Sequence, residues 1–204
     1  MTIRAVLATR NDHKVQEVTR ILQAEGIDIE LIALPSDAPD VAETESTFAG
    51  NALLKARSAA EATGLPAIAD DSGLCVDALH GMPGVLSARW SGRHGDDAAN
   101  LALVLAQLSE VPDARRGAQF VCAAAWVVPD SHEHVVEGML EGTLAHEPRG
   151  SHGFGYDPIF MPQGYALTTA ELRPHEKDAI SHRGQALRAL ARSVLSGQRP
   201  PFMP

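Results

Sequence analysis

Residues 3–14 read IRAVLATRNDHK, and this stretch decides the fold class. Its first half, Ile3 to Ala8, is a short apolar run that ends where Thr9 to Asp12 begins. Beyond it, apolar residues recur at helical spacing, at Val15, Val18 and Leu22. Gly26 follows, and glycine commonly ends a helix. The stretch predicts a strand, a turn and a helix, as at the start of many α/β domains.

The rest of the chain continues this mixture of patterns. Apolar runs predict further strands at Ile27–Leu34, Pro66–Asp70, Leu74–Leu79, Gln119–Val128, His134–Leu144 and Pro158–Phe160. Helices are expected at Thr47–Thr63, Asp96–Ser109 and Ser181–Leu195, with a long loop at Pro35–Ser46 and a Gly/Pro-rich segment at Gly81–Gly95. The two long strands near the middle pair around Pro129. We therefore expect an α/β fold with a mixed central sheet flanked by helices.

Composition limits what this chain does. Its 204 residues carry 17 Lys+Arg against 26 Asp+Glu, a net charge of −9, which suits one domain over residues 1–204. The longest apolar run, Phe120–Val128, is too short for a membrane span, and Met1–Arg10 has no signal-peptide pattern. We therefore expect a cytoplasmic protein that does not bind a membrane. An acidic chain without a basic tract disfavours nucleic acid as a partner. Two cysteines exclude a four-cysteine zinc site.

The junction of the first strand and helix carries the pattern Thr9-x-Asn11-x-x-Lys14-x-x-Glu17. Backbone N–H groups, a hydroxyl, an amide and an ammonium meet there at the positive end of a helix dipole, which outlines an anion pocket. The alternative is a plain helix cap by Asn11 or Asp12, with Lys14 in solvent.

Asp70-Asp71-Ser72-Gly73 follows an apolar strand. One carboxylate should point to each side at the carboxyl end of that strand, where α/β proteins bind ligands, and carboxylates there suit Mg²⁺. An ordinary Asp-Ser-Gly turn is equally compatible. Glu43 and Glu45 in the long loop either complete a metal site or are solvated. Lys55, on the polar face of the Thr47–Thr63 helix, either reaches the same anion or faces solvent.

Two later segments also carry chemistry. Gly153-Phe154-Gly155-Tyr156-Asp157-Pro158 places aromatic rings and a carboxylate between glycines, which suits a heterocyclic base, or forms a structural turn. Lys177, His182 and Arg183 are potential cations at or before the start of the last helix. The helix dipole disfavours cations there, so they indicate either a ligand or tolerated surface charge.

Taken together, these motifs closely resemble the inosine triphosphate pyrophosphatase family, whose members hydrolyse deaminated purine nucleoside triphosphates to the monophosphate and pyrophosphate. The resemblance runs in order from residue 7 to about residue 190. It rests on Thr9-x-Asn11-x-x-Lys14, Asn51-Ala52-x-x-Lys55-Ala56, Ala69-Asp70-Asp71-Ser72-Gly73-Leu74, Pro83-Gly84-Val85-x-Ser87-Ala88-Arg89, Gly153-Phe154-Gly155-Tyr156-Asp157-Pro158 and Ser181-His182-Arg183-Gly184-x-Ala186-Leu187.

The resemblance implies an elongated, two-lobed α/β domain with a cleft between the lobes, a homodimer and Mg²⁺ dependence. It implies Asp71 as metal ligand and proton acceptor, with Glu43 assisting the metal and Ser72 at the substrate. Around the phosphates it implies Thr9, Arg10, Asn11, Asp12, His13, Lys14 and Lys55. Around the nucleotide, mainly its base, it implies Phe154, Gly155, Tyr156, Asp157, Lys177, His182 and Arg183. The base would be selected through its 6-keto oxygen, which accepts hydrogen bonds from His182 and Arg183.

The chain departs from the family pattern at two positions. Arg10 stands where the family often has a small residue, so it either adds a phosphate contact or crowds the pocket. Gly50 stands where an acidic residue often precedes Asn51, which leaves a carboxylate out of the metal shell. Two other functions remain open: pyrophosphate release from a modified pyrimidine triphosphate, as in the related Maf-like proteins, and a nucleotide sensor that does not hydrolyse.

Overall fold

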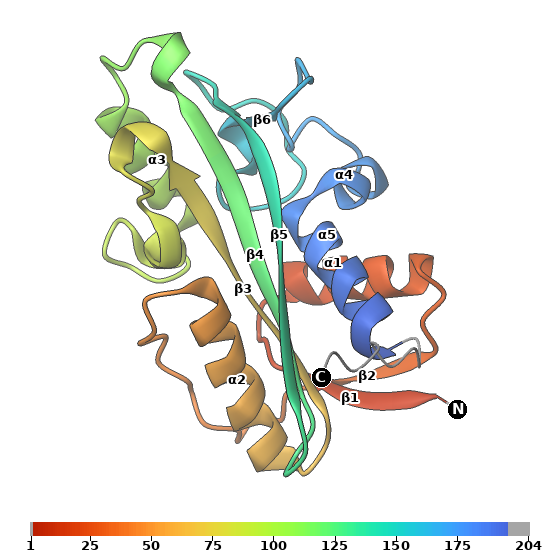
Figure 1. The fold of residues 1–204 in the computed structure, drawn as a ribbon. Helices are drawn as coiled ribbons and strands as arrows, with labels where there is room; N and C mark the ends of the chain where they lie inside the picture. The colour runs from red at the N-terminus through yellow and green to blue at the C-terminus, as the bar shows by residue number, and fades with distance from the viewer. Residues whose placement is uncertain (1, 196–204) are drawn as a thin grey trace, which may run out of the picture. The chain divides into compact units, whose positions relative to one another are not determined.

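The computed structural model describes residues 2–195 (Figure 1). Its strands are β1 (Ile3–Leu7), β2 (Ile29–Ala33), β3 (Ala67–Val76), β4 (Gly117–Val127), β5 (Glu133–Leu144) and β6 (Phe160–Pro162). Its α-helices are α1 (Asp12–Ala24), α2 (Phe48–Thr63), α3 (Asp97–Gln107), α4 (Pro174–Ile180) and α5 (His182–Leu190). Short 3-10 helices lie at Asp77–Leu79, Gly84–Arg89, Asp113–Arg115 and Asp157–Ile159, and a π-helical turn at Ala191–Leu195. Within residues 2–195, none of the helices is both long and apolar enough to cross a membrane.

The strands form one sheet in the order β2-β1-β3-β4-β5-β6. Strand β1 runs parallel to both β2 and β3, with Ile3 opposite Ile29 and Val6 opposite Ala67. At the other edge, β6 runs antiparallel to β5. The sheet therefore contains both pairing directions, and the predicted mixed sheet flanked by helices is confirmed.

Strand β3 differs from the sequence prediction. The Asp-Ser-Gly stretch was expected to end one strand before another began at Leu74, but Ala67–Val76 is one continuous strand. Asp70 and Asp71 therefore lie inside a strand, not at its carboxyl end. Both are nearly buried, at 3% and 5% exposed, and a strand tolerates buried carboxylates only where cations pair with them. Helix α4 was not predicted, because its seven residues begin at Pro174 and carry no apolar period.

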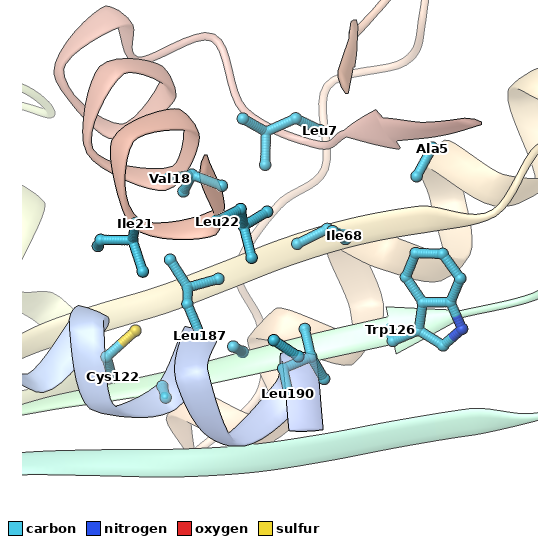
Figure 2. Packing of buried hydrophobic residues seen from close by; sticks show 13 residues of the cluster. Ala5, Leu7, Val18, Ile21, Leu22, Ile68, Cys122, Trp126, Leu187 and Leu190 are labelled. Carbon is cyan, nitrogen blue, oxygen red and sulfur yellow. The ribbon is translucent and has the colours of Figure 1, made fainter. Parts of the chain in front are cut away.

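The chain divides into two compact units, and β3, β4 and β5 contribute residues to both. The first unit comprises residues 1–71, 122–138 and 183–204; the second comprises residues 72–121 and 139–182. In the first, Val18, Ile21 and Leu22 of α1 pack with Leu187 and Leu190 of α5 over the strands (Figure 2). The second has its own core, which includes Leu74, Val104, Leu108, Phe120, Tyr156 and Phe160.

Helix α2 is defined by local signals and packs closely. Thr47 caps it by accepting a hydrogen bond from the N–H of Gly50, and Gly64 ends it in the left-handed conformation at φ 68°. Four alanines on its buried side are at most 3% exposed: Ala52, Ala56, Ala59 and Ala60. Small side chains let the helix approach the strands closely, which brings Lys55 next to β3.

Candidate active site

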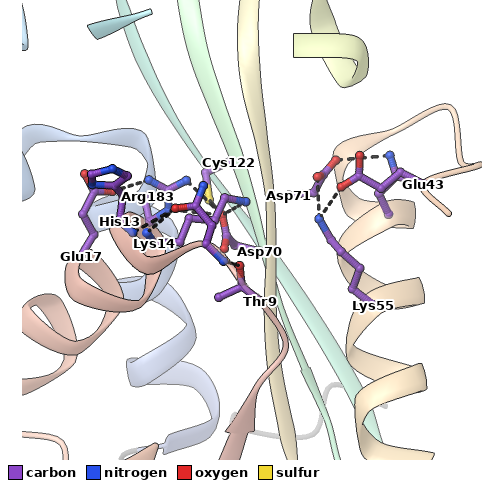
Figure 3. A network of polar contacts seen from close by, with 12 residues as sticks. Thr9, His13, Lys14, Glu17, Glu43, Lys55, Asp70, Asp71, Cys122 and Arg183 are labelled. Atoms are coloured by element: carbon purple, nitrogen blue, oxygen red, sulfur yellow. Dashed lines mark hydrogen bonds and ion pairs between the residues drawn. The ribbon is translucent and has the colours of Figure 1, made fainter. Parts of the chain in front are cut away.

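Adjacent aspartates on β3 point to opposite faces of the strand (Figure 3). Asp70 faces α1 and α5, and Asp71 faces α2. This is the alternation that a strand imposes on neighbouring side chains. The prediction that one carboxylate lies on each side is therefore confirmed, and each has its own set of partners.

On the Asp71 side, one ammonium group joins two carboxylates. Nζ of Lys55 lies 2.7 Å from Oδ1 of Asp71 and 2.9 Å from Oε1 of Glu43. The amide of Asn51 donates to the second oxygen of Asp71 at 3.3 Å. The long loop thus brings Glu43 to Asp71, as expected, and Lys55 does not face solvent, since its side chain is 15% exposed.

The charges in this cluster shift one another's protonation. Burial raises the pKa of Asp71, Lys55 opposes the shift, and Glu43 adds to it, which leaves the pKa at about 6. Burial would lower the pKa of Lys55, but Asp71, Asp70 and Glu43 outweigh it and raise that pKa. At neutral pH Asp71 is therefore mainly ionised, yet it accepts a proton more readily than an ordinary aspartate.

On the opposite face, Asp70 is held by cations from two helices. Nζ of Lys14 lies 3.0 Å from Oδ2 of Asp70, and Nη2 of Arg183 lies 3.1 Å from the same oxygen. Arg183 also binds the carboxylate of Glu17 through Nη1. Burial would raise the pKa of Asp70, but the charges of Lys14 and Arg183 hold it well below its usual range. Asp70 is a permanent anion that fixes its cations.

The segment from Thr9 to Lys14 forms the turn into α1. Oδ1 of Asn11 accepts hydrogen bonds from the backbone N–H groups of His13 and Lys14, at 3.0 and 3.3 Å, so the helix cap considered as the alternative is present. The other part of that alternative is wrong, because Lys14 pairs with Asp70 and does not lie in solvent. The hydroxyl of Thr9 accepts one from the N–H of Asn11 at 3.1 Å. Asn11, Asp12 and His13 are exposed at the N-terminus of the helix. Arg10 instead points to the long loop, where it contacts Ala38 and Asp40.

In the second unit, Asp157 is the centre of a buried polar cluster. Nζ of Lys177 donates to its Oδ2 at 2.6 Å, and the backbone N–H of Phe154 donates to the same oxygen at 2.9 Å. Thr169 donates to Oδ1 at 2.8 Å. The Lys177 ammonium also lies 5.4 Å from the centre of the Phe154 ring. A half-buried ring and a cation are thus held side by side.

Other residues assigned to the nucleotide have structural contacts in this unit. Tyr156 is 5% exposed, lies in the core and donates a hydrogen bond from its hydroxyl group to the backbone oxygen of Ser87. Its ring therefore does not form the open stacking surface that the sequence predicts. Gly155 donates its N–H to Asp97 at 2.8 Å. His182 stacks on Phe120 with ring centres 4.7 Å apart. Ser72 is half-buried in β3, next to Asp71.

The cations near the last helix have carboxylate partners within the protein. From the sequence, their unfavourable position is compatible with a ligand or with tolerated surface charge. Lys177 binds Asp157, and Arg183 binds Asp70 and Glu17. Arg183 is 2% exposed, and its guanidinium group is held by these carboxylates in the protein without nucleotide.

Sequence reasoning missed several residues that hold the clusters together. Glu17 was visible as part of the Thr9–Glu17 pattern, one helical turn after Lys14, but its partner lies 166 positions away. Asn51 was visible on the polar face of α2, but its contact with Asp71 was not. Thr169 had no signal in the sequence, because two adjacent threonines in a loop, Thr168 and Thr169, are compatible with any role.

The donor set beside Lys55 suits a hard divalent cation. Asp71 and Glu43 both direct an oxygen at the same positive group, so they converge on one cation position. Residues 2–195 contain no group of three or more His, Cys, Asp or Glu side chains placed to hold a metal ion. Mg²⁺ needs no such group, because it is usually bound by one or two carboxylates together with waters and substrate phosphates.

A model of the Ham1 family matches residues 5–193. The chain belongs to the Ham1 family. A protein from Streptomyces avermitilis named dITP/XTP pyrophosphatase is 60% identical to this chain over 189 residues. These residues cover 92% of this chain and 94% of the relative. This similarity supports the resemblance seen in the motifs.

Solved structures of Ham1 relatives agree with the fold. The nucleoside-triphosphatase / dITP/XTP pyrophosphatase from Mycobacterium abscessus is 57% identical with a TM-score of 0.74, covering 92% of this chain and 97% of the other. The HAM1 protein from Coxiella burnetii is 44% identical with a TM-score of 0.86, covering 97% and 100%. The Ham1 fold therefore extends over nearly the whole chain.

Proposed function

We propose that this chain hydrolyses deaminated purine nucleoside triphosphates, namely ITP, dITP and XTP, to the monophosphate and pyrophosphate. The observation that carries the proposal is the pair of oppositely directed aspartates on β3, each joined to a lysine that the motifs assign to phosphate binding. The names of the relatives support the same substrates. Removing such nucleotides would keep them out of nucleic acid.

We further propose Mg²⁺ as the cofactor, held by Asp71 and Glu43. When bound, the ion would neutralise phosphate charge and polarise the bond to phosphorus. Lys55 already lies between both carboxylates. When Asp71 and Glu43 bind the metal ion, the ammonium group of Lys55 would be placed to contact a phosphate oxygen instead. The lysine would then stabilise charge that develops on the substrate.

The remaining steps belong to side chains around the triphosphate. Thr9, Asn11, Asp12 and His13 border the N-terminus of α1, where a helix favours phosphate groups, and Lys14 lies beside them. Asp71 would also accept a proton from the attacking water, and in the metal-free protein burial and Glu43 raise the pKa of its carboxyl group. Bond breaking at phosphorus would release pyrophosphate.

Base recognition is assigned to the second unit. We propose that Phe154 stacks on the purine and that Gly155, Asp157, Lys177 and His182 supply polar contacts around it. The proposed site donates hydrogen bonds to the 6-keto oxygen of the base. Adenine has an amino group at that position, which also donates, so no hydrogen bond forms. Such a mismatch favours the correct base by a factor of about 10⁴ or more. Tyr156 then shapes this site from the core, and Ser72 lies at the substrate.

We also propose that the chain acts as a cytoplasmic homodimer, without nucleic acid or membrane as a partner, and that residues 1–204 form a single domain. The net charge of −9 supports the first exclusion, because affinity for nucleic acid depends on many cations facing phosphates. Sedimentation at micromolar concentration tests the dimer.

Product analysis tests the proposed activity. Purified protein with Mg²⁺ and equal concentrations of ITP, XTP, ATP, GTP and dTTP should convert only ITP and XTP, and should give monophosphate and pyrophosphate. Diphosphate and phosphate as products would overturn the reaction. Equal hydrolysis of all five would overturn base recognition, a preference for pyrimidines would favour the Maf-like activity, and tight binding without products would favour a sensor.

A further inference from the structure

Arg10 lies in the turn between β1 and α1, but its guanidinium group contacts a different loop. Nη2 donates to the backbone oxygen of Ala38 at 2.7 Å, and Nη1 pairs with Oδ1 of Asp40. Both partners belong to residues 34–47, which join β2 to α2 without helix or strand. Arg10 therefore connects two loops of the same unit.

The loop that Arg10 contacts carries Glu43, three residues after Asp40. On its far side the loop is fixed again, because the N–H of Glu45 donates to Oδ1 of Asn51 at 3.0 Å. Asn51 in turn donates to Asp71 at 3.3 Å. Glu43 is thus held between an attachment at residues 38–40 and another at residue 45.

The two contacts of Arg10 differ in strength. Ala38 is 8% exposed, so the oxygen that accepts the hydrogen bond is more buried than the carboxylate of Asp40, and the bond itself is partly buried. The Asp40 side chain is 93% exposed, and an ion pair in solvent contributes little. A planar guanidinium group suits this double contact, because it presents several donors in a fixed arrangement. We expect the bond to Ala38 to provide most of the attachment.

We propose that Arg10 is a positioning residue that fastens loop 34–47 to the phosphate-binding turn and thereby sets where Glu43 lies before substrate arrives. This inference concerns the same site and rests on the proposed function for the use made of Glu43. A positioning role acts through Ala38 and Asp40 whether or not a nucleotide is bound, whereas a phosphate contact of Arg10 has no effect until the triphosphate arrives. The two roles therefore predict different behaviour in the absence of nucleotide.

Limited proteolysis without nucleotide or metal separates them. A glutamate-specific protease should cleave Arg10→Met after Glu43 or Glu45 about tenfold faster than the parent chain, because a charge-assisted hydrogen bond is lost. Asp40→Asn should raise the rate about two- to fivefold, the effect of an exposed ion pair. Arg4→Met, which removes an exposed pair with Glu30, is the matched control and should leave the rate unchanged.

A double-mutant cycle then tests the consequence for the site. Asp40→Asn should raise the Mg²⁺ concentration for half-maximal turnover in the parent chain but not in Arg10→Met, because the two act through one contact. The inference would be overturned if Arg10→Met were cleaved at the same rate as the parent chain. It would also be overturned if Arg10→Met raised the KM for the nucleotide while Asp40→Asn left that KM unchanged, and Arg10 would then be a phosphate ligand. Proteolysis uses no substrate, so its result stands even if the proposed activity fails.

Discussion

The neighbouring aspartates of β3 show how surroundings determine what one residue type does. Asp70 is buried against Lys14 and Arg183, which hold its pKa well below the usual range. Asp71 is buried beside Lys55 and Glu43, and its pKa rises to about 6. One aspartate is thus a fixed counter-ion, whereas its neighbour takes up a proton more readily, which supports the proposed role of Asp71 as proton acceptor.

Replacing Asp71 tests that assignment. We expect Asp71→Asn to lower kcat by about 10² to 10⁴, because the amide neither accepts a proton nor carries charge. The amide is nearly the same size, so the thermal midpoint should change little. Steady-state kinetics with dITP measure the effect, and Asp28→Asn, an exposed carboxylate in the same unit, serves as control. A near-normal kcat would contradict the role of Asp71.

Arg183 should matter for stability first. Its removal leaves Asp70 and Glu17 buried without their guanidinium partner, and breaking a buried ion pair in this way costs about 3–5 kcal/mol. We expect Arg183→Ala to lower Tm by about 10 °C, since each kcal/mol shifts a chain of this size by about 2–4 °C.

Arg57→Ala is the matched arginine control for that experiment. Its pair with Glu133 is exposed, so its loss should cost less than about 1 kcal/mol. Calorimetry of both variants decides the point. Equal small shifts in Tm would mean that the Arg183 network is not a buried anchor, and would restore Arg183 as a candidate for reading the base.

Cys122 provides a pH-dependent prediction. Burial raises the pKa of its thiol to about 12, with Asp70 adding to the shift. The folded state favours the neutral thiol over the thiolate. This preference stabilises the fold fully below about pH 8.5, the ordinary pKa of a thiol. The stabilisation is lost as the pH rises toward 12. The difference in unfolding free energy between the parent chain and Cys122→Ala should therefore shrink above pH 9. A pH-independent difference would contradict it.

At the scale of elements, β3 marks where sequence reasoning succeeds and where it fails. The alternation of Asp70 and Asp71 was predictable, because a strand fixes it locally. The continuity of the strand through Ser72 and Gly73 was not, because Asp-Ser-Gly is common in turns. The strand lies between β1 and β4 in the sheet, and its two buried carboxylates are paired with residues of α1, α2 and α5. All these partners are distant in sequence and invisible to a local pattern.

The same distinction holds for the site. Asn11 as helix cap follows from a motif whose spacing is local, whereas the sequence left open whether Lys55 reaches the site or faces solvent. The contact of Arg183 with Glu17 spans 166 positions, and only the assembled fold reveals it. Tyr156 is instructive for the opposite reason: glycines around an aromatic ring suggested an open binding surface, whereas the ring fills the core.

The loop containing Gly153 gives a prediction at this scale. Gly153 has φ +75°, and a Cβ there would lie 2.1 Å from Oδ2 of Asp157. Gly153→Ala should displace Asp157 from Lys177 and raise the KM for dITP about tenfold, because a polar contact to the base is lost. Gly164→Ala has a similar φ of +82° with open space around its Cβ, so it controls for backbone strain. Equal KM values in the two variants would contradict the prediction.

For the whole molecule, the balance of charge explains why an acidic chain needs help to bind a polyanion. In the first unit, Lys14, Lys55 and Arg183 already face four carboxylates, those of Asp70, Asp71, Glu43 and Glu17. The cations of the site are thus compensated before a nucleotide arrives. We therefore expect a triphosphate to need additional positive charge, which the proposed Mg²⁺ would supply.

Thermal unfolding of the parent chain tests binding apart from chemistry when the nucleotides are analogues of dITP and ATP whose bond between the α- and β-phosphates cannot be hydrolysed. A ligand at 100 times its Kd stabilises the folded state by about 2.7 kcal/mol, which corresponds to a Tm rise of about 5–10 °C in a chain of this size. We expect that rise with the dITP analogue and Mg²⁺, a much smaller one with the ATP analogue and Mg²⁺, and none with the dITP analogue in the presence of a chelator. Equal shifts for the two analogues would leave phosphate binding intact while contradicting base recognition. A full shift under chelation would show that the compensated lysines of the first unit bind the triphosphate without a metal.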